Sequence, residues 1–454
     1  MLPEDFIKRI KLQPYIDLAS LSEALEKPAP VSIRLNPAKW SGKLPQEEVV
    51  PWEPLGFYLE TRPQYTLDPF FHAGVYYPQE ASGMFTGEVF RQLSAGRKEL
   101  RILDLCAAPG GKSTHLSALL GDNGFLVANE VIRSRASVLA ENITKWGTGN
   151  VIVTQNDPAD FKELEGFFDM IFIDAPCSGE GMFNDREALK EWSVANTQLC
   201  SERQKRILVN AWHALKPGGF LIYSTCTFNP AENEENIAWL NDGMKALPVR
   251  IDISGYHGIA EINLRGITGY GFHPGRIRGD GFFISVLMKE GAKREFLPGR
   301  KSRSSKSPSK LHPEIKEMIS ADEDKLSFFD SRIIMLAAGN DLHDYIADRL
   351  NIIKSGTMIG EVKNNSFIPA HDLAMSVKLR RSYWLEYEVS YDEAMAFLRH
   401  DSLRLREGRT GRLILSYREI PLGFVNNLGN RVNNGYPQPW RVRMEKKDIF
   451  RPVL

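Results

Sequence analysis

A short apolar run followed by a small-residue turn and a helical pattern, at residues 101–120, constrains the fold of this chain more than any other feature. The apolar run ends at Asp104 and Leu105, and Pro109-Gly110-Gly111 breaks it. Residues 112–120 then carry apolar or small side chains at the spacing of a helix face. A strand, a turn and a helix in this order form the first unit of an open α/β sheet, in which ligands bind beyond the carboxyl ends of the strands.

The turn itself excludes two familiar phosphate-binding motifs. A Walker loop requires glycine where this chain has Cys106, and the dinucleotide fingerprint requires Gly-x-Gly-x-x-Gly where residues 106–111 read Cys-Ala-Ala-Pro-Gly-Gly. The small residues still let backbone N–H groups approach a ligand closely. The turn therefore predicts a nucleoside ligand without a pyrophosphate, and S-adenosylmethionine fits that description.

Acidic residues follow the next strand patterns in a regular order. From residue 100 to about 290 strand and helix patterns alternate, and four consecutive strands end in Asp104, Glu130, Asp157 and Asp174. A single acid at a strand end is more often a cap or a loop former. Four of them in series point to one crevice, because the carboxyl ends of parallel strands share one edge of a sheet. The second acid suits the ribose hydroxyls of an adenosine, and the third suits its adenine amino group.

Two cysteines, Cys177 and Cys226, follow the fourth and fifth of these strands. Either one alone is more simply explained as a small buried hydrophobe. Together they suggest methyl transfer to carbon 5 of a pyrimidine, because a thiolate that adds to carbon 6 makes carbon 5 reactive toward a sulfonium methyl group. The scheme also needs an acid that hydrogen-bonds ring nitrogen 3 and the exocyclic amine. Because a base leaves a loop more easily than a duplex, single-stranded or melted RNA is the expected substrate.

Composition limits the partners of the chain. Lysine and arginine number 57, as do aspartate and glutamate, so any basic footprint for RNA must be local. The four cysteines form no Cys-x-x-Cys pair, which argues against a zinc site or a disulfide framework, and we expect no metal. No apolar run reaches membrane length, and the N-terminus lacks a signal-peptide core. We therefore expect a cytoplasmic monomer that contacts no membrane.

The two ends of the chain lie outside this alternation. The strand pattern at residues 31–37 predicts a solvated edge-strand charge at Arg34, and the tyrosines at 76 and 77 suit base stacking and lobe anchoring equally.

Residues 291–311 are basic and serine-rich, typical of a linker, with phosphate contact as the weaker alternative. Residues 313–350 show mostly helical patterns. Short strands near the C-terminus predict a small β-barrel module, whose basic residues alternate with Tyr436 and Trp440, consistent with RNA contact: Arg431, Arg441, Arg443, Lys446 and Lys447.

Several of these motifs together resemble a known family. Asp104-Leu-Cys-Ala-Ala-Pro-Gly-Gly-Lys112, Asp174-Ala-Pro-Cys-Ser-Gly-Glu-Gly181 and Ser224-Thr-Cys-Thr227 resemble the signature motifs of the Nop/Sun family of RNA cytosine carbon-5 methyltransferases. Ile420-Pro-Leu-Gly423 and Gly429-Asn-Arg431 are similar to segments of the RsmF-type bacterial ribosomal RNA enzymes. The resemblance implies an α/β fold, with a Rossmann-like class I methyltransferase sheet, a small α+β N-terminal lobe and a C-terminal PUA-like β-barrel module. The expected segments are an RNA-binding lobe at 1–95, the methyltransferase core at 96–290, a basic linker at 291–311, a connector subdomain at 312–375 and a PUA-like RNA-binding module at 376–454.

The same resemblance implies roles for individual residues. Cys226 is the nucleophile, Cys177 assists elimination and product release, and Asp174 hydrogen-bonds the target cytosine. S-adenosyl-L-methionine is the implied cofactor, held by Cys106, Ala107, Ala108, Pro109, Gly110, Gly111, Lys112, Glu130, Asp157 and Asp174. RNA is the implied partner, either 16S ribosomal RNA or the 30S particle, with contacts from Arg34, Asn36 and Arg431. Several relatives carry aspartate at position 130, and glutamate there keeps the ribose contact.

Other readings remain open at this point. The residues alone allow either cysteine to be the nucleophile, and DNA cytosine methyltransferases use the one in the Pro-Cys step, here Cys177. Transfer RNA is an alternative substrate. Nitrogen methylation typically needs a Pro-Pro-aromatic step where this chain has Pro176-Cys177-Ser178. Intact acids and both cysteines argue against a vestigial ribosome-assembly factor that only binds RNA.

Overall fold

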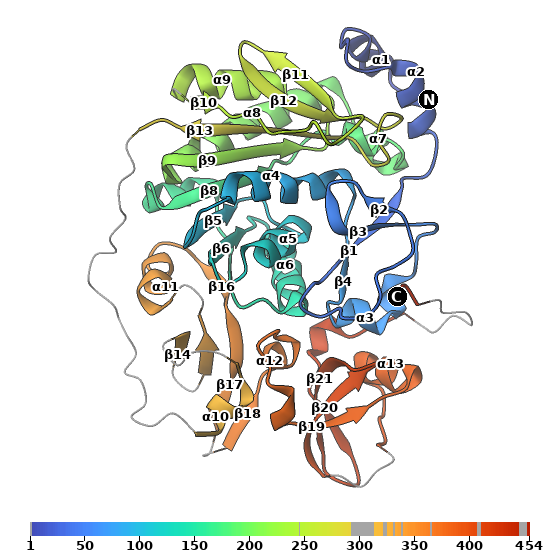
Figure 1. Ribbon diagram of the computed structural model, residues 1–454, viewed down its shortest axis with the longest axis vertical. Coiled ribbons are helices and arrows are strands. Elements are labelled where there is room, and N and C mark those ends of the chain that lie inside the picture. Colours follow the sequence, from blue (N-terminus) through green and yellow to red (C-terminus); the bar gives the residue numbers. More distant parts are fainter. Residues whose placement is uncertain are drawn as a thin grey trace.

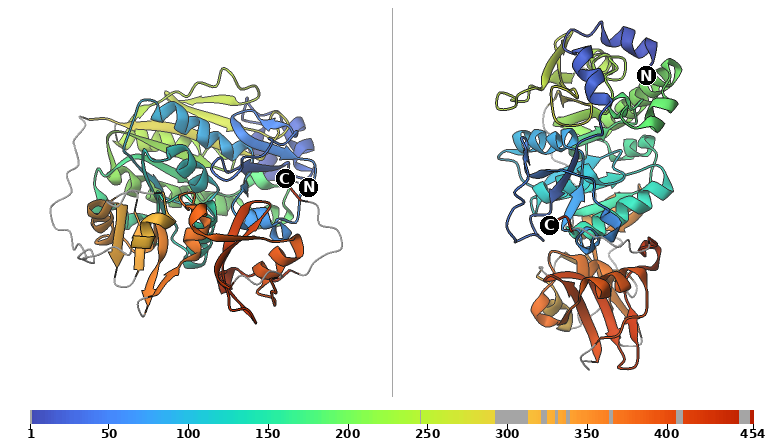
Figure 2. Two further views of the ribbon diagram at one scale, coloured as in Figure 1. Left: turned by 60° about the horizontal axis from the view of Figure 1, so that its bottom comes forward. Right: turned by 90° about the vertical axis from the view of Figure 1, so that its right-hand side faces the viewer.

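The computed structural model describes residues 2–244, 246–291, 313–320, 325–329, 332–336, 339–363, 366–405, 410–444 and 452–454. The expected linker, apart from residue 291, and the basic residues Lys446 and Lys447 lie outside this part of the chain. The molecule is elongated, with its N-terminal helices at one end and its C-terminal module at the other (Figures 1 and 2).

A large mixed sheet forms the centre of the molecule (Figure 1). Its strands run in the order β11-β12-β13-β9-β8-β5-β6-β7-β16, and β10 pairs with β13. The bounds of these strands are β5 Leu100–Asp104, β6 Gly124–Asn129, β7 Val151–Thr154, β8 Phe168–Asp174, β9 Leu215–Thr225, β10 Ala246–Pro248, β11 Ala260–Leu264, β12 Ile267–Phe272, β13 Phe282–Lys289 and β16 Ile352–Ser355. The strands β9, β8, β5, β6 and β7 pair in parallel, as the alternating pattern predicts. The chain reverses its direction of travel across the sheet at β5, which places a ligand crevice beyond the ends of β5 and β8.

The alternating strand and helix patterns of residues 100–290 predict a parallel sheet that is complete near residue 290, and this prediction is wrong in two respects. β13 runs antiparallel to β9, and β16, which follows the expected linker, pairs antiparallel with β7 at the opposite edge. β9 begins at Leu215, five residues before the apolar run from Phe220 that predicts this strand. Lys216-Pro-Gly-Gly219, whose proline and glycines predict the end of the preceding helix, does follow the end of α8 at Ala214. The same segment forms an irregularity in the pairing with β8, whose register shifts between Phe168 and Met170.

Helices cover both faces of the sheet (Figure 1). On one face lie α4 Phe85–Ser94, α5 Gly111–Leu120 and α6 Arg133–Trp146. On the other lie α8 Val194–Ala214, α9 Glu234–Met244 and α11 Gly339–Ala347, and the short α7 Arg186–Glu191 precedes α8. Apolar side chains on the helices, such as Leu116 and Leu208, are fully buried against the strands. Burial of these faces stabilises the layers and fixes the loops at the carboxyl edge.

The N-terminal lobe contains an antiparallel sheet in the order β2-β3-β1-β4. Its elements are α1 Glu4–Ile10, α2 Leu18–Leu25, β1 Val31–Leu35, β2 Val49–Val50, β3 Glu53–Leu59, α3 Pro69–His72 and β4 Tyr76–Pro78. β1 lies between β3 and β4, so the expectation of a solvated edge-strand charge at Arg34 is wrong. Tyr76 is buried and donates to Asp68 Oδ2 at 2.9 Å, which supports its anchoring role over base stacking.

The segment after the linker forms a second antiparallel sheet, in the order β14-β15-β17-β18. Its elements are α10 Pro313–Met318, β14 Leu326–Phe329, β15 Arg332–Met335, β17 Thr357–Lys363, β18 Ser366–Pro369 and α12 His371–Met375. The mostly helical pattern expected for residues 313–350 is therefore wrong at β14 and β15. These strands are rich in aromatic and β-branched residues, which pack well on a pleated surface.

The C-terminal module contains the short strands that the sequence predicts, in the order β19-β20-β21-β22. Its elements are β19 Leu385–Glu388, α13 Tyr391–Arg399, β20 Gly411–Tyr417, β21 Ile420–Asn427 and β22 Val432–Asn434. The module shares one apolar core with the N-terminal lobe, in which Phe70 and Tyr417 have ring centroids 5.5 Å apart. None of the helices in the described part of the chain is long and apolar enough to cross a membrane.

Candidate active site at the carboxyl edge of the sheet

The two cysteines expected in the crevice come together. Cys177 follows β8 and Cys226 follows β9, and their sulfur atoms are 2.9 Å apart. The backbone N–H of Cys226 also donates to Cys177 Sγ at 3.3 Å. The hydrogen bond with Cys226, burial and the charge of Glu232 raise the pKa of Cys177 well above its usual value. Cys177 is therefore a protonated thiol at neutral pH, directly beside the second sulfur.

Asp174, at the end of β8, is held in one orientation by two donors. Ser224 Oγ donates to Oδ1 at 2.8 Å, and Lys112 Nζ lies 2.9 Å from Oδ2. Burial opposes the charge of Lys112, but the contact with Asp174 outweighs it and raises the pKa of the lysine above its ordinary value. Sequence reasoning grouped Lys112 with the cofactor loop and did not foresee this ion pair with Asp174.

A buried carboxylate braces the loop that carries Cys177. Glu232 is fully buried and accepts hydrogen bonds from Ser178 N–H at 2.9 Å, from Ser178 Oγ at 2.5 Å and from Gln204 Nε2 at 3.0 Å. The N–H of Gly181 donates to the carbonyl of Cys226 at 2.9 Å and joins the two cysteine loops. Sequence reasoning missed Glu232, since it lies in a loop beyond the motifs and only the fold brings it under Cys177.

The loop between β5 and α5, residues 106–112, has the shape of a ligand cradle. Gly110 has a φ of +115°, in the region that favours glycine, and a side chain there would meet Leu139 at 3.2 Å. Below the loop, Asp104 Oδ2 accepts from Ser113 Oγ at 2.6 Å, while Oδ1 is buried without a partner. Burial, together with the charges of neighbouring carboxylates, raises the pKa of Asp104 to about 7.

The acid after the second parallel strand completes this cradle. Glu130 is 4% exposed, accepts from the N–H of Ile132 at 3.0 Å and lies 3.4 Å from Arg135. Arg135 in turn donates to the carbonyl of Ala108 at 2.9 Å and ties the acid to the loop. S-adenosylmethionine, with its sulfonium and ammonium groups, fits these residues, because a cationic ligand offsets the crowded carboxylates and the unpaired oxygen of Asp104.

Asp157 differs from the other acids of the series. Its Oδ1 accepts from the N–H of Ala159 at 2.9 Å and caps a short 3-10 helix at Pro158–Leu164. Its Oδ2 lies 3.5 Å from Arg206. The expected adenine contact of Asp157 stays a prediction, because helix capping already explains an aspartate at this position.

The residues expected to contact RNA fall into two groups. Arg34 and Asn36 are each 1% exposed, and the amide of Asn36 donates to the carbonyls of Gly74 and Trp146 at 3.0 and 2.9 Å. The expectation of direct RNA contact by these two residues is wrong, because both are buried and satisfied inside the protein. Arg431 is exposed on the C-terminal module, and its RNA contact stays a prediction.

This strand order, the glycine turn after the first parallel strand and the acids at the following strand ends define a class I S-adenosylmethionine-dependent methyltransferase. Within the described residues, no group of three or more histidine, cysteine, aspartate or glutamate side chains is placed to hold a metal ion.

Known proteins resemble the chain over nearly its whole length. Family models match for the N-terminal domain of 16S rRNA methyltransferase RsmF over residues 2–81, for 16S rRNA methyltransferase RsmB/F over residues 92–288 and for the methyltransferase RsmF PUA domain over residues 385–442. Ribosomal RNA small subunit methyltransferase F of Shewanella sp. (strain W3-18-1) is 30% identical over 475 residues, which cover 96% of each chain. Its counterpart in Enterobacter sp. (strain 638) is 28% identical over 472 residues, 96% of this chain and 95% of the relative. The chain therefore belongs to the family of ribosomal RNA small subunit methyltransferase F, and its reaction is S-adenosylmethionine-dependent methylation of RNA.

A solved structure agrees with this assignment. The methyltransferase homolog protein from Pyrococcus horikoshii is 31% identical and superimposes with a TM-score of 0.51, covering 60% of this chain and 90% of that one. The RsmF-type resemblance and the PUA-like C-terminal module expected from the sequence are thus confirmed.

Proposed function

We propose that this chain methylates carbon 5 of cytosine in 16S ribosomal RNA through a covalent bond between Cys226 and the base. The observation that carries the proposal is the convergence of two thiols, 2.9 Å apart, beside an oriented carboxylate at the carboxyl edge of the sheet. Such a group serves nucleophilic catalysis, in which a thiolate adds to the base and later leaves.

The chain's own residues divide the work as follows. Cys226 adds through its sulfur to carbon 6, and carbon 5 of the ring becomes the nucleophile. Asp174, oriented by Lys112 and Ser224, hydrogen-bonds ring nitrogen 3 and the exocyclic amine of the target. S-adenosylmethionine supplies the methyl group when bound against residues 106–112, with Glu130 at its ribose and Asp157 at its adenine.

Release of the product requires a base, such as a water molecule, to take the carbon 5 proton while the bond between carbon 6 and Cys226 breaks and its electron pair returns to the sulfur. Cys177 is suited to assist, because its raised pKa keeps a proton on the sulfur that lies beside Cys226. A hydrogen bond from this thiol stabilises the departing Cys226 thiolate. Glu232 supports the step by holding the Cys177 loop through Ser178.

The first test replaces the nucleophile. Cys226→Ala should form no covalent adduct with RNA that contains 5-fluorocytosine, and its methylation rate should fall by at least about 10⁴-fold, as expected for loss of a covalent catalyst. The matched control is Cys200→Ala, which removes a buried thiol on α8 and should retain both reactions. An adduct that persists in Cys226→Ala would show that the assignment is wrong.

The second test separates the two cysteines. Cys177→Ala should still attack the base through Cys226 but release it poorly, so that an RNA–protein adduct accumulates while turnover falls. Denaturing gel electrophoresis of the protein with unmodified RNA measures the adduct. If Cys177→Ala abolishes the adduct and Cys226→Ala keeps it, the nucleophile is Cys177.

The third test concerns the substrate. Bisulfite sequencing of total RNA from a deletion strain should reveal loss of cytosine methylation in 16S ribosomal RNA. Loss in transfer RNA but not in ribosomal RNA would overturn this part of the proposal. The proposal further divides the chain into five functional units at residues 1–95, 96–290, 291–311, 312–375 and 376–454. It also holds that the protein is a cytoplasmic monomer, for which light scattering should give the mass of one chain.

A further inference from the structure

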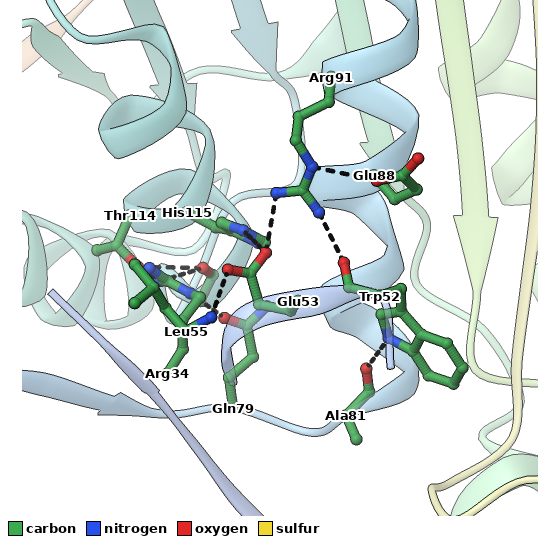
Figure 3. A network of polar contacts seen from close by, with 11 residues as sticks. Arg34, Trp52, Glu53, Leu55, Gln79, Ala81, Glu88, Arg91, Thr114 and His115 are labelled. Carbon is green, nitrogen blue, oxygen red and sulfur yellow. Dashed lines mark hydrogen bonds and ion pairs between the residues drawn. The ribbon is translucent and has the colours of Figure 1, made fainter. Parts of the chain in front are cut away.

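A buried arginine of the N-terminal lobe contacts the end of the cofactor loop. Arg34 extends from β1, and its Nε donates to Gln79 Oε1 at 2.8 Å (Figure 3). Its Nη2 donates to Thr114 Oγ1 at 2.7 Å and to the carbonyl of Gly111 at 3.2 Å. One guanidinium group thus links the sheet of the lobe to the first turn of α5.

The position of Gly111 gives this contact its importance. Gly111 closes the cofactor loop and is the first residue of α5. The next residue, Lys112, carries the ammonium that pairs with Asp174 at 2.9 Å. A displacement of the Gly111 carbonyl therefore moves both the loop that holds the cofactor and the cation that orients Asp174.

A cation at this place is not explained by packing alone. The hydrogen-bond acceptors of Arg34 are neutral oxygens, and its guanidinium lies 4.4 Å from the ring centroid of Trp146. Burial lowers its pKa to about 10, so the group still carries its charge at neutral pH. A buried charge at the positive end of a helix dipole is unfavourable unless other groups compensate. Here the charge of Glu53 and three directed hydrogen bonds favour the cation. Those hydrogen bonds fix the atoms around Gly111.

The same lobe makes a second polar contact that serves as an internal comparison. Glu53 Oε2 lies 2.8 Å from His115 Nε2 and 3.1 Å from Arg91 Nη1, and Arg91 Nη2 donates to the carbonyl of Trp52 at 2.6 Å (Figure 3). Arg91 belongs to α4, and its contacts hold the lobe to the core away from the first turn of α5. Arg34 and Arg91 are thus both arginines at the interface between the lobe and the core, but only Arg34 contacts the cofactor loop.

We propose that Arg34 is a positioning residue for methyl transfer, which sets the cofactor loop and Lys112 through the carbonyl of Gly111. The inference rests on the proposed function, since it takes residues 106–112 as the cofactor site and Asp174 as the group that faces the target base. It also explains why Arg34, expected at the RNA surface, lies inside the protein.

The test compares Arg34→Met, Arg34→Lys and Thr114→Val with the matched control Arg91→Met. Binding of S-adenosylhomocysteine without RNA is measured by calorimetry, and kcat and KM for S-adenosylmethionine are measured on RNA. Arg34→Met should bind about 10-fold more weakly and lose about 100-fold in kcat/KM, because small misplacements of a site have effects of this size. Arg34→Lys should recover part of both. Arg91→Met should stay within about two-fold of the wild type in both, since it loses contacts of similar strength but none at the loop.

Thermal melting of each variant shows at which temperatures it is folded, so that a loss of affinity is not mistaken for unfolding. All constants are measured at a temperature at which each variant is folded. Thr114→Val is the milder change: it removes the hydrogen bonds of Oγ1 with Arg34 and with the carbonyl of Gly111, and it should bind S-adenosylhomocysteine about three-fold more weakly. If Arg34→Met and Arg91→Met lose affinity equally, or if Arg34→Met and Thr114→Val both bind as the wild type does, the positioning role is overturned. Cys226→Ala should keep wild-type affinity in this assay, so failure of the covalent mechanism remains distinguishable from failure of the positioning role.

Discussion

The N-terminal lobe makes two junctions that differ in their balance of polar and apolar contacts. Against the methyltransferase core it uses buried hydrogen bonds and charges, with Arg34 and Glu53 meeting α5. Against the C-terminal module it uses mainly apolar packing, with Phe70 against Tyr417, together with a few hydrogen bonds such as that from Tyr391 Oη to the carbonyl of Leu67 at 3.1 Å. Hydrogen bonds are directional and fix individual atoms, whereas apolar burial is roughly proportional to area and has no preferred direction. The hydrogen bonds of Arg34 at the first junction are therefore able to position the cofactor loop, whereas the second junction mainly determines how firmly the C-terminal module is held.

The largest expected effect is a loss of folding stability when the apolar junction is disrupted. Phe70→Ala removes a ring that is 2% exposed and should lower the free energy of unfolding by about 3–5 kcal/mol, measured by urea denaturation. Affinity for S-adenosylhomocysteine should be unchanged while the variant is folded. The control, Leu428→Ala, truncates an exposed leucine of the C-terminal module and should change stability by less than about 0.5 kcal/mol. Weaker cofactor binding by folded Phe70→Ala would break the distinction between the junctions.

The stability that the polar junction contributes should depend on pH, because the junction contains the ionisable side chain of Glu53. Burial opposes ionisation of Glu53, but His115 and Arg91 outweigh it and lower its pKa to about 2, from an ordinary value of 4.5. The stability that Glu53 contributes is then present above pH 4.5 and is lost as the pH falls through 4.5 toward 2. Glu53→Gln should lower the free energy of unfolding by about 3 kcal/mol at pH 7, since it leaves a buried network without its anion.

Acid denaturation provides the check on this second prediction. Because Glu53→Gln has no carboxylate to protonate, it should lose less stability than the wild type between pH 5 and pH 3. Glu88→Gln, which removes the other acid bound to Arg91 at a more exposed position, should lower stability by no more than about 1 kcal/mol. The prediction fails if Glu53→Gln and Glu88→Gln lower the free energy of unfolding equally. It also fails if the stability of Glu53→Gln falls with decreasing pH as steeply as that of the wild type.

The smallest expected effect is on RNA affinity, at a residue of the C-terminal module outside both junctions. Arg431→Ala removes an exposed cation of the C-terminal module and should weaken RNA binding by about three-fold, with the salt dependence reduced by about one ion, as for one phosphate contact. Fluorescence anisotropy at several salt concentrations measures both quantities. Arg250→Ala, an exposed arginine of the core paired with Glu261, serves as the control and should change neither. If the two variants behave alike, the module does not use Arg431 to hold RNA.

Sequence reasoning predicted the parts of the molecule that depend on local pattern. The strands from β5 to β9 are apolar runs followed by an acid or a cysteine, so their alternation with helices and the meeting of Cys177 with Cys226 at one edge were predictable, whereas the order of the strands within the sheet was not. The burial of Arg34 did not follow, because its partners Gln79 and Thr114 lie far along the chain and only the fold brings them together. Glu232 was missed for the same reason. β14 and β15 were assigned to a helical segment because short apolar runs fit both periodicities.

The edge strand β16 has a consequence for how the protein is made. Ile152 and Thr154 of β7 pair with Ser355 and Ile352, so the central sheet is completed only after the ribosome has synthesised some two hundred residues beyond β7. A nascent chain that stops at residue 291 leaves the apolar strand β7 with bare N–H and C=O groups, an edge that invites association with other chains. The catalytic part of this enzyme thus depends for its completion on the half of the polypeptide that emerges last.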